Sequence, residues 1–242
     1  MVLTITLNPL LERRLVYENI KTGSANRPLN EYFTAGGKGI NVSRQLNKLG
    51  IKNNAITFLG GGNGKILRSL LADDKIDATF VSTKAETRQA SLCLDKSRDE
   101  LTTYFGMNPV ITEAEADDMK SRLEKAITNC SIVILSGSSP CGAADSIFPL
   151  AIELANKHDK ISIIDTYGNH LKACIEKGPT VLHNNIKELS ASLGLDLSSE
   201  EARSDLLKEL YGKGIRMAFI TDGASPVYAS KFDLHYQAII PR

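Results

Sequence analysis

Residues 35–43 combine glycines, a lysine and an asparagine in a pattern that suits the binding of an anion. Gly36, Gly37 and Gly39 precede an amphipathic run that is typical of a helix. Glycines at a helix start let the backbone approach a ligand closely, and the free amides and the helix dipole favour an anion there. Lys38 adds a positive charge, and Asn41 offers a hydrogen-bond donor and an acceptor. A polyol phosphate would use all of these groups, whereas a plain connecting turn would use only the glycines.

Other motifs for nucleotide binding and hydrolysis are incomplete. Residues 60–65 are glycine-rich, but a P-loop would need glycine in place of Leu59 and serine or threonine in place of Ile66. The dinucleotide pattern G-x-G-x-x-G that starts at Gly60 fails at Lys65. The nucleophile elbow G-x-S-x-G does not occur in the sequence. These gaps disfavour a P-loop nucleotidase, a nicotinamide dehydrogenase and a serine hydrolase.

The composition is that of an ordinary globular protein with balanced charge. The 242 residues include 29 basic and 28 acidic side chains, and 42% are hydrophobic. A net charge of +1 provides no field for nucleic acid or an anionic membrane, and no apolar run approaches the ~20 residues that span a bilayer. The four cysteines are widely spaced, which disfavours a zinc site or a disulfide framework and suits a reducing compartment. We expect a cytoplasmic protein with neither nucleic-acid nor membrane partners.

Apolar strands and helices alternate along most of the chain. Two stretches, 13–33 and 88–105, interrupt this alternation with short strands of mixed polarity. The pattern predicts strands at 3–7, 13–17, 27–33, 54–59, 78–82, 88–95, 101–105, 131–135, 161–164, 180–182, 217–221, 227–229 and 234–240, and helices at 38–49, 65–72, 112–129, 144–157, 170–176, 187–193 and 200–211.

This order of elements predicts an α/β fold of the three-layer αβα type. Alternating strands and helices form a mostly parallel sheet that is covered on both faces. We expect one domain, residues 1–242, with a small accessory sheet made from the insertions 13–33 and 88–105. Ligands of such sheets bind beyond the carboxyl ends of the strands, and small or polar residues follow almost every predicted strand.

Six motifs carry a resemblance to a known family. They are T-L-N-P at 6–9, A-G-G-K-G-I-N-V at 35–42, T-R at 87–88, S-G-S-S-P at 136–140, D-T-Y-G at 165–168 and N-I-K-E at 185–188. In this order they resemble ribokinase-like sugar kinases, and within them the phosphofructokinase B branch with 1-phosphofructokinase and tagatose-6-phosphate kinase. The resemblance implies a ribokinase-like domain whose accessory sheet is a lid over the sugar and can form a homodimer contact.

The resemblance also implies which residues bind the substrate. It places Gly37 and Asn41 against sugar hydroxyls, and Lys38 with Arg88 near a phosphate already present on the sugar. Two cations near a dianion make charge-assisted contacts that a neutral sugar cannot supply. Alternatively, Lys38 is a solvated lysine at a helix start and Arg88 pairs with Glu86. The family commonly has aspartate as a ligand for sugar hydroxyls at position 12, where this chain has Glu12.

ATP and Mg²⁺ are the cofactors that the resemblance implies. Asn185 and Glu188 match an N-x-x-E element that helps to hold magnesium, which prefers oxygen ligands and keeps several waters. Alternatively, Glu188 is a first-turn glutamate that the helix dipole favours without a metal. His183, Thr221 and Gly223 take positions at the nucleotide, although the family usually has a lysine and a proline before the N-x-x-E asparagine.

The chain also departs from the family pattern. Pro226 removes an amide that could bind phosphate, and the stretch 103–108 is unlike the sugar-phosphate members. The family's glycine-rich G-A-G-D-like loop, which carries the aspartate that acts as catalytic base, has no counterpart in the sequence up to Arg242. We therefore assign no catalytic base, and expect a shortened chain that has most of a sugar site and is not an efficient kinase alone.

The function expected from these features is ATP-dependent phosphorylation of a ketohexose phosphate such as fructose 1-phosphate or tagatose 6-phosphate. One alternative is a non-catalytic protein that binds sugar phosphates, which the absent base favours. A second alternative is a kinase of an unphosphorylated sugar or nucleoside, which would be favoured if Lys38 or Arg88 pointed away from the pocket.

Overall fold

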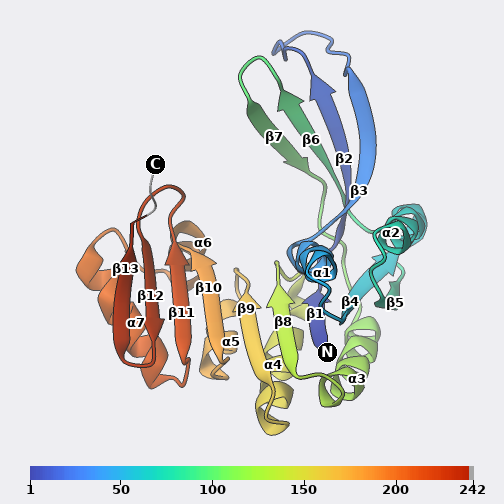
Figure 1. Cartoon of the computed structure of the whole chain (residues 1–242). Helices are drawn as coiled ribbons and strands as arrows, with labels where there is room; N and C mark the ends of the chain where they lie inside the picture. The colour runs from blue at the N-terminus through green and yellow to red at the C-terminus, as the bar shows by residue number, and fades with distance from the viewer. Residues whose placement is uncertain (240–242) are drawn as a thin grey trace.

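Nine strands form one large sheet in the computed structural model, which describes residues 1–239 (Figure 1). Seven of them are parallel, and the last two join one edge as an antiparallel pair. Across the sheet the order is β13 (Leu234–Ala238), β12 (Val227–Lys231), β11 (Met217–Thr221), β10 (Val181–Asn185), β9 (Ile161–Asp165), β8 (Ile132–Ser136), β1 (Val2–Thr6), β4 (Asn53–Gly60) and β5 (Ala78–Thr83).

Helices cover both faces of this sheet and give the three layers that the sequence predicts. The two helices nearest the N-terminus pack with β4 in one apolar cluster, and the other five helices that the structure describes pack in a larger cluster. The helices are α1 (Lys38–Lys48), α2 (Gly61–Asp73), α3 (Glu113–Thr128), α4 (Ile147–Lys157), α5 (Leu171–Glu176), α6 (Ile186–Leu193) and α7 (Glu200–Gly212), with a 3-10 turn at Gly142–Ala144.

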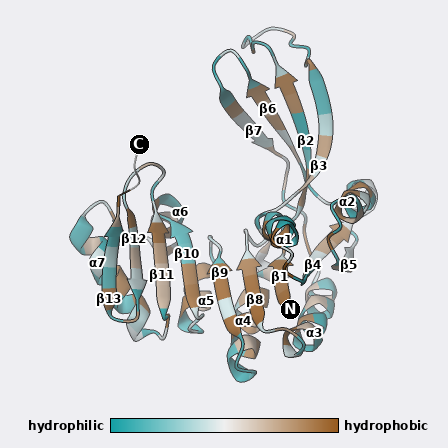
Figure 2. Ribbon diagram, in the orientation of Figure 1, coloured by the Kyte–Doolittle hydropathy of each residue, from teal (hydrophilic) through white to brown (hydrophobic). Residues whose placement is uncertain are grey.

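The core lies along the central strands. All five residues of β1 are buried, because a parallel strand between two neighbours is covered on both faces. Figure 2 shows that hydrophobic residues gather on the strands of the large sheet. Phe148 of α4 is the largest of the fully buried side chains and lies in the larger cluster.

A second sheet of four strands stands apart from the large one (Figure 1). Its order is β3 (Asn30–Gly36), β2 (Leu10–Tyr17), β6 (Gln89–Asp95) and β7 (Glu100–Phe105). The buried carboxylate of Asp95 accepts hydrogen bonds from the backbone of Ile20 and from Ser97 and Arg98. These bonds tie the turn after β6 to the loop after β2.

The glycine-rich segment after β4 differs from its prediction. We predicted a helix from residue 65, yet α2 begins at Gly61. The carboxylate of Glu86 accepts a hydrogen bond of 2.6 Å from the backbone N–H of Asn63, and so supplies the acceptor that a helix start needs. This partner is distant in sequence, so local pattern reasoning did not find it.

Most of the remaining boundaries lie within two residues of the predictions, but three strands differ by three residues. β2 begins at Leu10 and not at 13, β3 spans Asn30–Gly36 and not 27–33, and β10 ends at Asn185 and not at 182. The predicted helix 144–157 is divided into the 3-10 turn and α4. The predicted strand 234–240 is observed as Leu234–Ala238, and position 240 lies outside the described residues. Within residues 1–239, every helix is too short or too polar to serve as a membrane span.

Candidate functional site

The candidate site lies where β1 ends between β8 and β4. At this point the chain connections diverge to opposite sides of β1, which is the topological switch point where open α/β sheets bind ligands. A pocket of about 230 Å³ opens here between the large sheet, α1 and the second sheet. Its lining includes all five residues that the sequence predicts to contact the substrate, namely Glu12, Gly37, Lys38, Asn41 and Arg88.

Two glycines allow α1 to begin directly against β1. Gly37 has φ 131°, a backbone conformation that disfavours other residues, and an added Cβ would lie 2.9 Å from the Cγ2 of Thr6. At Gly39, an added Cβ would lie 2.4 Å from the Oγ1 of Thr6. The close approach brings the exposed Asn41 to the pocket within one turn of the helix start.

Glu12 on β2 is held by its own sheet. Its Oε2 accepts hydrogen bonds from the guanidinium of Arg14 (2.7 Å to Nη2) and from the hydroxyl of Thr34 (3.1 Å). The Glu12 side chain is only 12% exposed and lies against Gly36, where an added Cβ would be 2.5 Å from Oε1. Glu12 therefore faces the pocket in a fixed orientation.

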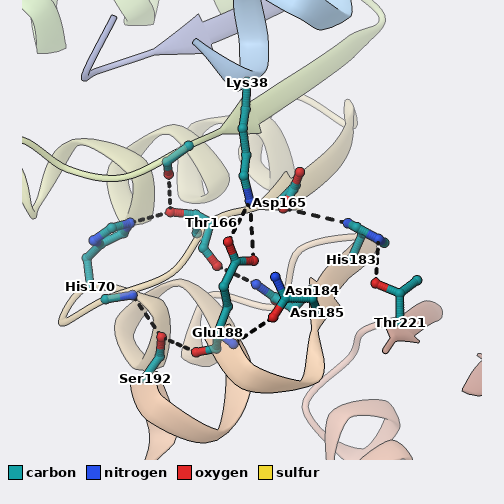
Figure 3. Close-up of polar contacts among 12 residues, drawn as sticks. Lys38, Asp165, Thr166, His170, His183, Asn184, Asn185, Glu188, Ser192 and Thr221 are labelled. Carbon is teal, nitrogen blue, oxygen red and sulfur yellow. Dashed lines mark hydrogen bonds and ion pairs between the residues drawn. The ribbon is translucent and has the colours of Figure 1, made fainter. Parts of the chain in front are cut away.

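Lys38 joins three elements through ion pairs (Figure 3). Its Nζ lies 3.0 Å from the Oδ1 of Asp165 at the end of β9, and 3.1 Å from the Oε1 of Glu188 in α6. The ammonium also lies 5.0 Å from the ring centre of Tyr167. The alternative that Lys38 is a solvated lysine is therefore wrong, because both carboxylates engage it.

The charges in this cluster depend on one another. Burial disfavours the charged ammonium of Lys38, but Asp165 and Glu188 outweigh burial and raise its pKa. Burial likewise opposes ionisation of Asp165, whereas His183 and Lys38 lower its pKa below the usual range. One ammonium between two carboxylates leaves one negative charge in excess, which suits a further cation better than a phosphate.

Arg88 also lines this pocket and is a cation that remains available to an anion. Its Nη1 donates to the Oδ1 of Asn108 (3.0 Å) and its Nη2 to the backbone carbonyl of Asn8 (3.1 Å). Its Nε is buried without a partner in the described residues. The alternative pairing with Glu86 is wrong, because that carboxylate caps α2. Burial lowers the pKa of Arg88, yet a guanidinium stays charged. Its hydrogen-bond partners among the described residues are neutral oxygens, so no carboxylate there neutralises the charge.

The two residues predicted to bind magnesium lie at the start of α6. The Oδ1 of Asn185 accepts a hydrogen bond of 2.8 Å from the backbone N–H of Glu188 and so caps the helix, while the Glu188 carboxylate pairs with Lys38. Among the described residues there is no group of three or more histidine, cysteine or acidic side chains that could hold a metal. A magnesium ion that keeps most of its waters needs only one or two carboxylates. Glu188 meets that requirement together with Asp165, which the sequence did not assign to the metal, whereas the predicted Asn185 uses its Oδ1 to cap α6.

The residues predicted at the nucleotide lie in β10, at the end of β11 and in the turn that follows β11; Figure 3 shows His183 and Thr221. The His183 Nε2 lies 3.5 Å from the hydroxyl of Thr221, and its Nδ1 lies 3.6 Å from Asp165. Gly223 follows in a tight turn with φ 54°, closed by a bond from the Ser225 N–H to the Asp222 carbonyl. His183 thus connects these strand ends to the Lys38 cluster.

Sequence reasoning assigned no role to several residues that hold the site together. The hydroxyl of Thr166 donates to the carbonyl of Gly137 (2.6 Å) and contacts the Nε2 of His170 (2.5 Å), and its carbonyl accepts from Asn184 (2.5 Å). These bonds lock the loops after β8 and β9 together (Figure 3). Gly137 and Thr166 belong to the motifs S-G-S-S-P and D-T-Y-G, but neither motif indicated these contacts.

His170 should make stability depend on pH. Burial lowers its pKa below the ordinary value of about 6.5, although Asp145 partly opposes this shift. As pH falls below 6.5 the unfolded chain binds a proton that the folded chain refuses, so stability falls by up to about 1.4 kcal/mol per pH unit until the folded pKa is reached. The melting temperature should therefore decline less steeply from pH 7.5 to pH 5 for His170→Gln than for the wild type. An equal decline of the melting temperature in both proteins would contradict this role of His170.

Comparison with known proteins agrees with this geometry. A model of the pfkB family of carbohydrate kinases matches residues 7–242. Phosphofructokinase-2 from Escherichia coli, solved with fructose-6-phosphate, superposes with a TM-score of 0.86 at 26% identity, covering 99% of this chain and 80% of the other. A possible 1-phosphofructokinase from Thermotoga maritima superposes with a TM-score of 0.89 at 26% identity, covering 98% and 76%.

The family match spans almost the whole chain, and the superpositions include both the large and the small sheet. The motifs, the switch-point pocket and these comparisons lead to the same conclusion: the chain belongs to the pfkB family of carbohydrate kinases.

Proposed function

We propose that this chain binds a ketohexose phosphate, such as tagatose 6-phosphate or fructose 1-phosphate, as the substrate of an ATP-dependent kinase. The observation that carries the proposal is Arg88, a half-buried guanidinium whose hydrogen-bond partners in the described residues are neutral oxygens. It lines the same pocket as Gly37 and Asn41, which would contact sugar hydroxyls. A phosphate on the sugar would supply the missing negative charge. The similarity to a phosphofructokinase solved with fructose-6-phosphate supports this choice.

The Lys38 cluster would serve the nucleotide side of the reaction. Bound Mg²⁺ would neutralise the nucleotide phosphates, and Glu188 and Asp165 are the carboxylates that would hold it through water. Lys38 lies in the sugar pocket and also contacts these carboxylates, so it would connect the sugar pocket to the magnesium site. His183, Thr221 and Gly223 would border the nucleotide.

The second sheet would act as a lid. Glu12 comes from its β2, and Arg88 directly precedes its β6, so both would follow the position of this sheet. Exposed apolar side chains on it, including Tyr104 and Phe105, offer a surface for a homodimer. A tetrameric inhibited form is known for the similar phosphofructokinase-2 from Escherichia coli.

Substrate binding can be tested by thermal unfolding of residues 1–242. We expect tagatose 6-phosphate or fructose 1-phosphate at 100 times Kd to raise the melting temperature by roughly 5–10 °C, and unphosphorylated tagatose or fructose to have little effect. An equal rise with both kinds of sugar would contradict the proposal and favour a kinase of unphosphorylated sugars. That second candidate has one observation in its favour, because Lys38 is already paired with carboxylates.

Residues 1–242 do not contain a G-x-G-D string, so we also propose that phosphoryl transfer by these residues alone is slow. ADP release should stay close to background while Mg·ATP still raises the melting temperature. The absence of any stabilisation by Mg·ATP would instead favour a non-catalytic protein that binds sugar phosphates.

A further inference from the structure

Asn108 lies outside the motifs that characterise the family, yet it contacts the arginine proposed to bind phosphate. Its Oδ1 accepts hydrogen bonds from the Nη1 of Arg88 (3.0 Å) and from the Nδ2 of Asn8 (3.0 Å). Asn8 is 3% exposed, and its backbone carbonyl accepts the second bond from Arg88. The guanidinium is therefore held at two of its nitrogens by Asn108 and Asn8.

The segment after β7 has the shape needed to bring Asn108 to this position. The N–H of Gly106 donates to the carbonyl of Gln89 (2.8 Å), next to Arg88, and an added Cβ at Gly106 would lie 2.8 Å from that carbonyl oxygen. The ring of Phe105 lies 5.6 Å from the Arg88 guanidinium. Residues 105–108 thus turn tightly around Arg88.

The partners of Arg88 differ from those of five other arginines in the part of the chain that the structure describes. Carboxylates pair with Arg13, Arg14, Arg44, Arg98 and Arg122. A carboxylate fixes a guanidinium and also cancels its charge, whereas the oxygen of a neutral amide fixes its direction and leaves the charge in place.

We propose that Asn108 is a positioning residue that holds the Arg88 guanidinium toward the phosphate of the substrate without neutralising it. This inference rests on the proposed binding of a sugar phosphate. It makes the neutrality of position 108 a determinant of specificity, because a carboxylate there would compete with the substrate phosphate for Arg88.

The decisive variant is Asn108→Asp, which keeps the size of the side chain and adds one negative charge. Asn108→Leu removes the oxygen without adding charge. Asn30→Asp is the matched control, because it adds the same carboxylate at the opposite end of the small sheet, where Asn30 is exposed and opposes Val16. Titration calorimetry with tagatose 6-phosphate, fructose 1-phosphate and their unphosphorylated sugars measures Kd for each variant.

We expect Asn108→Asp to raise the Kd for the phosphorylated ligand at least tenfold, and Asn108→Leu to raise it several-fold, as is typical when a charged hydrogen-bonding group is neutralised or loosened. Neither variant should change the Kd for the unphosphorylated sugar, and Asn30→Asp should match the wild type with both ligands. A general structural defect would instead raise the Kd for the phosphorylated and the unphosphorylated sugar together.

Two results would overturn the inference, and they can be told apart. If the wild type prefers the phosphorylated sugar but Asn108→Asp binds it like Asn30→Asp, the role of Asn108 is wrong and the proposed function stands. If the wild type binds phosphorylated and unphosphorylated sugars equally, the proposed function fails and the role of Asn108 fails with it.

Discussion

Replacing Arg88 with alanine should weaken the binding of a ketohexose phosphate by about 10- to 100-fold. The reason is that Arg88 is a half-buried cation in the pocket with neutral partners only, among the residues that the structure describes. Its loss would remove two charge-assisted hydrogen bonds to the phosphate, while the groups that face the sugar hydroxyls would remain. The Kd for unphosphorylated tagatose should therefore stay within about twofold of the wild type.

Arg88→Lys separates charge from geometry in the same experiment. A lysine keeps the positive charge but lacks the planar fork that Asn108 and the carbonyl of Asn8 hold, so we expect an intermediate Kd. Arg122→Ala is a suitable control, because this arginine pairs with Asp118 on the exposed face of α3. Equal losses for phosphorylated and unphosphorylated sugars in Arg88→Ala would show that Arg88 supports the pocket rather than the phosphate.

Lys38→Met should destabilise the fold and create a stronger cation site. Without the ammonium, the carboxylates of Asp165 and Glu188 would lose the cation that they share, and among the described residues the Asp165 carboxylate would keep only its contact with His183. We expect a loss of about 1–3 kcal/mol at pH 7, between the values for exposed and buried ion pairs, because Lys38 is 36% exposed. Mg²⁺ should recover part of the melting temperature in this variant and have less effect on the wild type.

The pH dependence checks the cause of that loss. In the wild type burial opposes ionisation of Asp165, but His183 and Lys38 together hold its pKa below the ordinary value of about 3.9. The part of this stabilisation that Lys38 contributes is present above that pH and is lost as pH falls through the folded pKa. The difference in the free energy of unfolding between the wild type and Lys38→Met should therefore disappear below about pH 4. Glu188→Gln combined with Lys38→Met should recover much of the stability, and the control Lys187→Met should resemble the wild type. A gap that is constant with pH would point to lost packing instead.

Much of the fold could be predicted from local pattern. The apolar strands that alternate with helices predicted the large sheet. The mixed polarity of 13–33 and 88–105 predicted strands of a separate sheet, which the structure contains as β2, β3, β6 and β7. The start of α2 could not be predicted, because its capping carboxylate comes from Glu86.

The sequence predicted which residues belong to the site better than it predicted how they contact one another. The substrate residues line one pocket because the strand ends converge at the switch point. The sequence did not reveal that Lys38 pairs with Asp165 and Glu188, which are 127 and 150 positions away, or that Asn108 contacts Arg88. Ion pairs over such distances depend on the packing of whole elements, which no local pattern encodes.

The central place of β1 has a consequence for the order of folding during synthesis. β1 is made first, yet its neighbour β8 begins at Ile132. At the usual rate of translation, β1 waits on the order of ten seconds for that partner. During that interval it can pair with β4 and be covered by α1, but Lys38 has neither of its carboxylates. The Lys38 cluster can therefore form only after Glu188 has been synthesised, and mutations in it should affect the docking of the segment that carries β9 and α6 more than early folding.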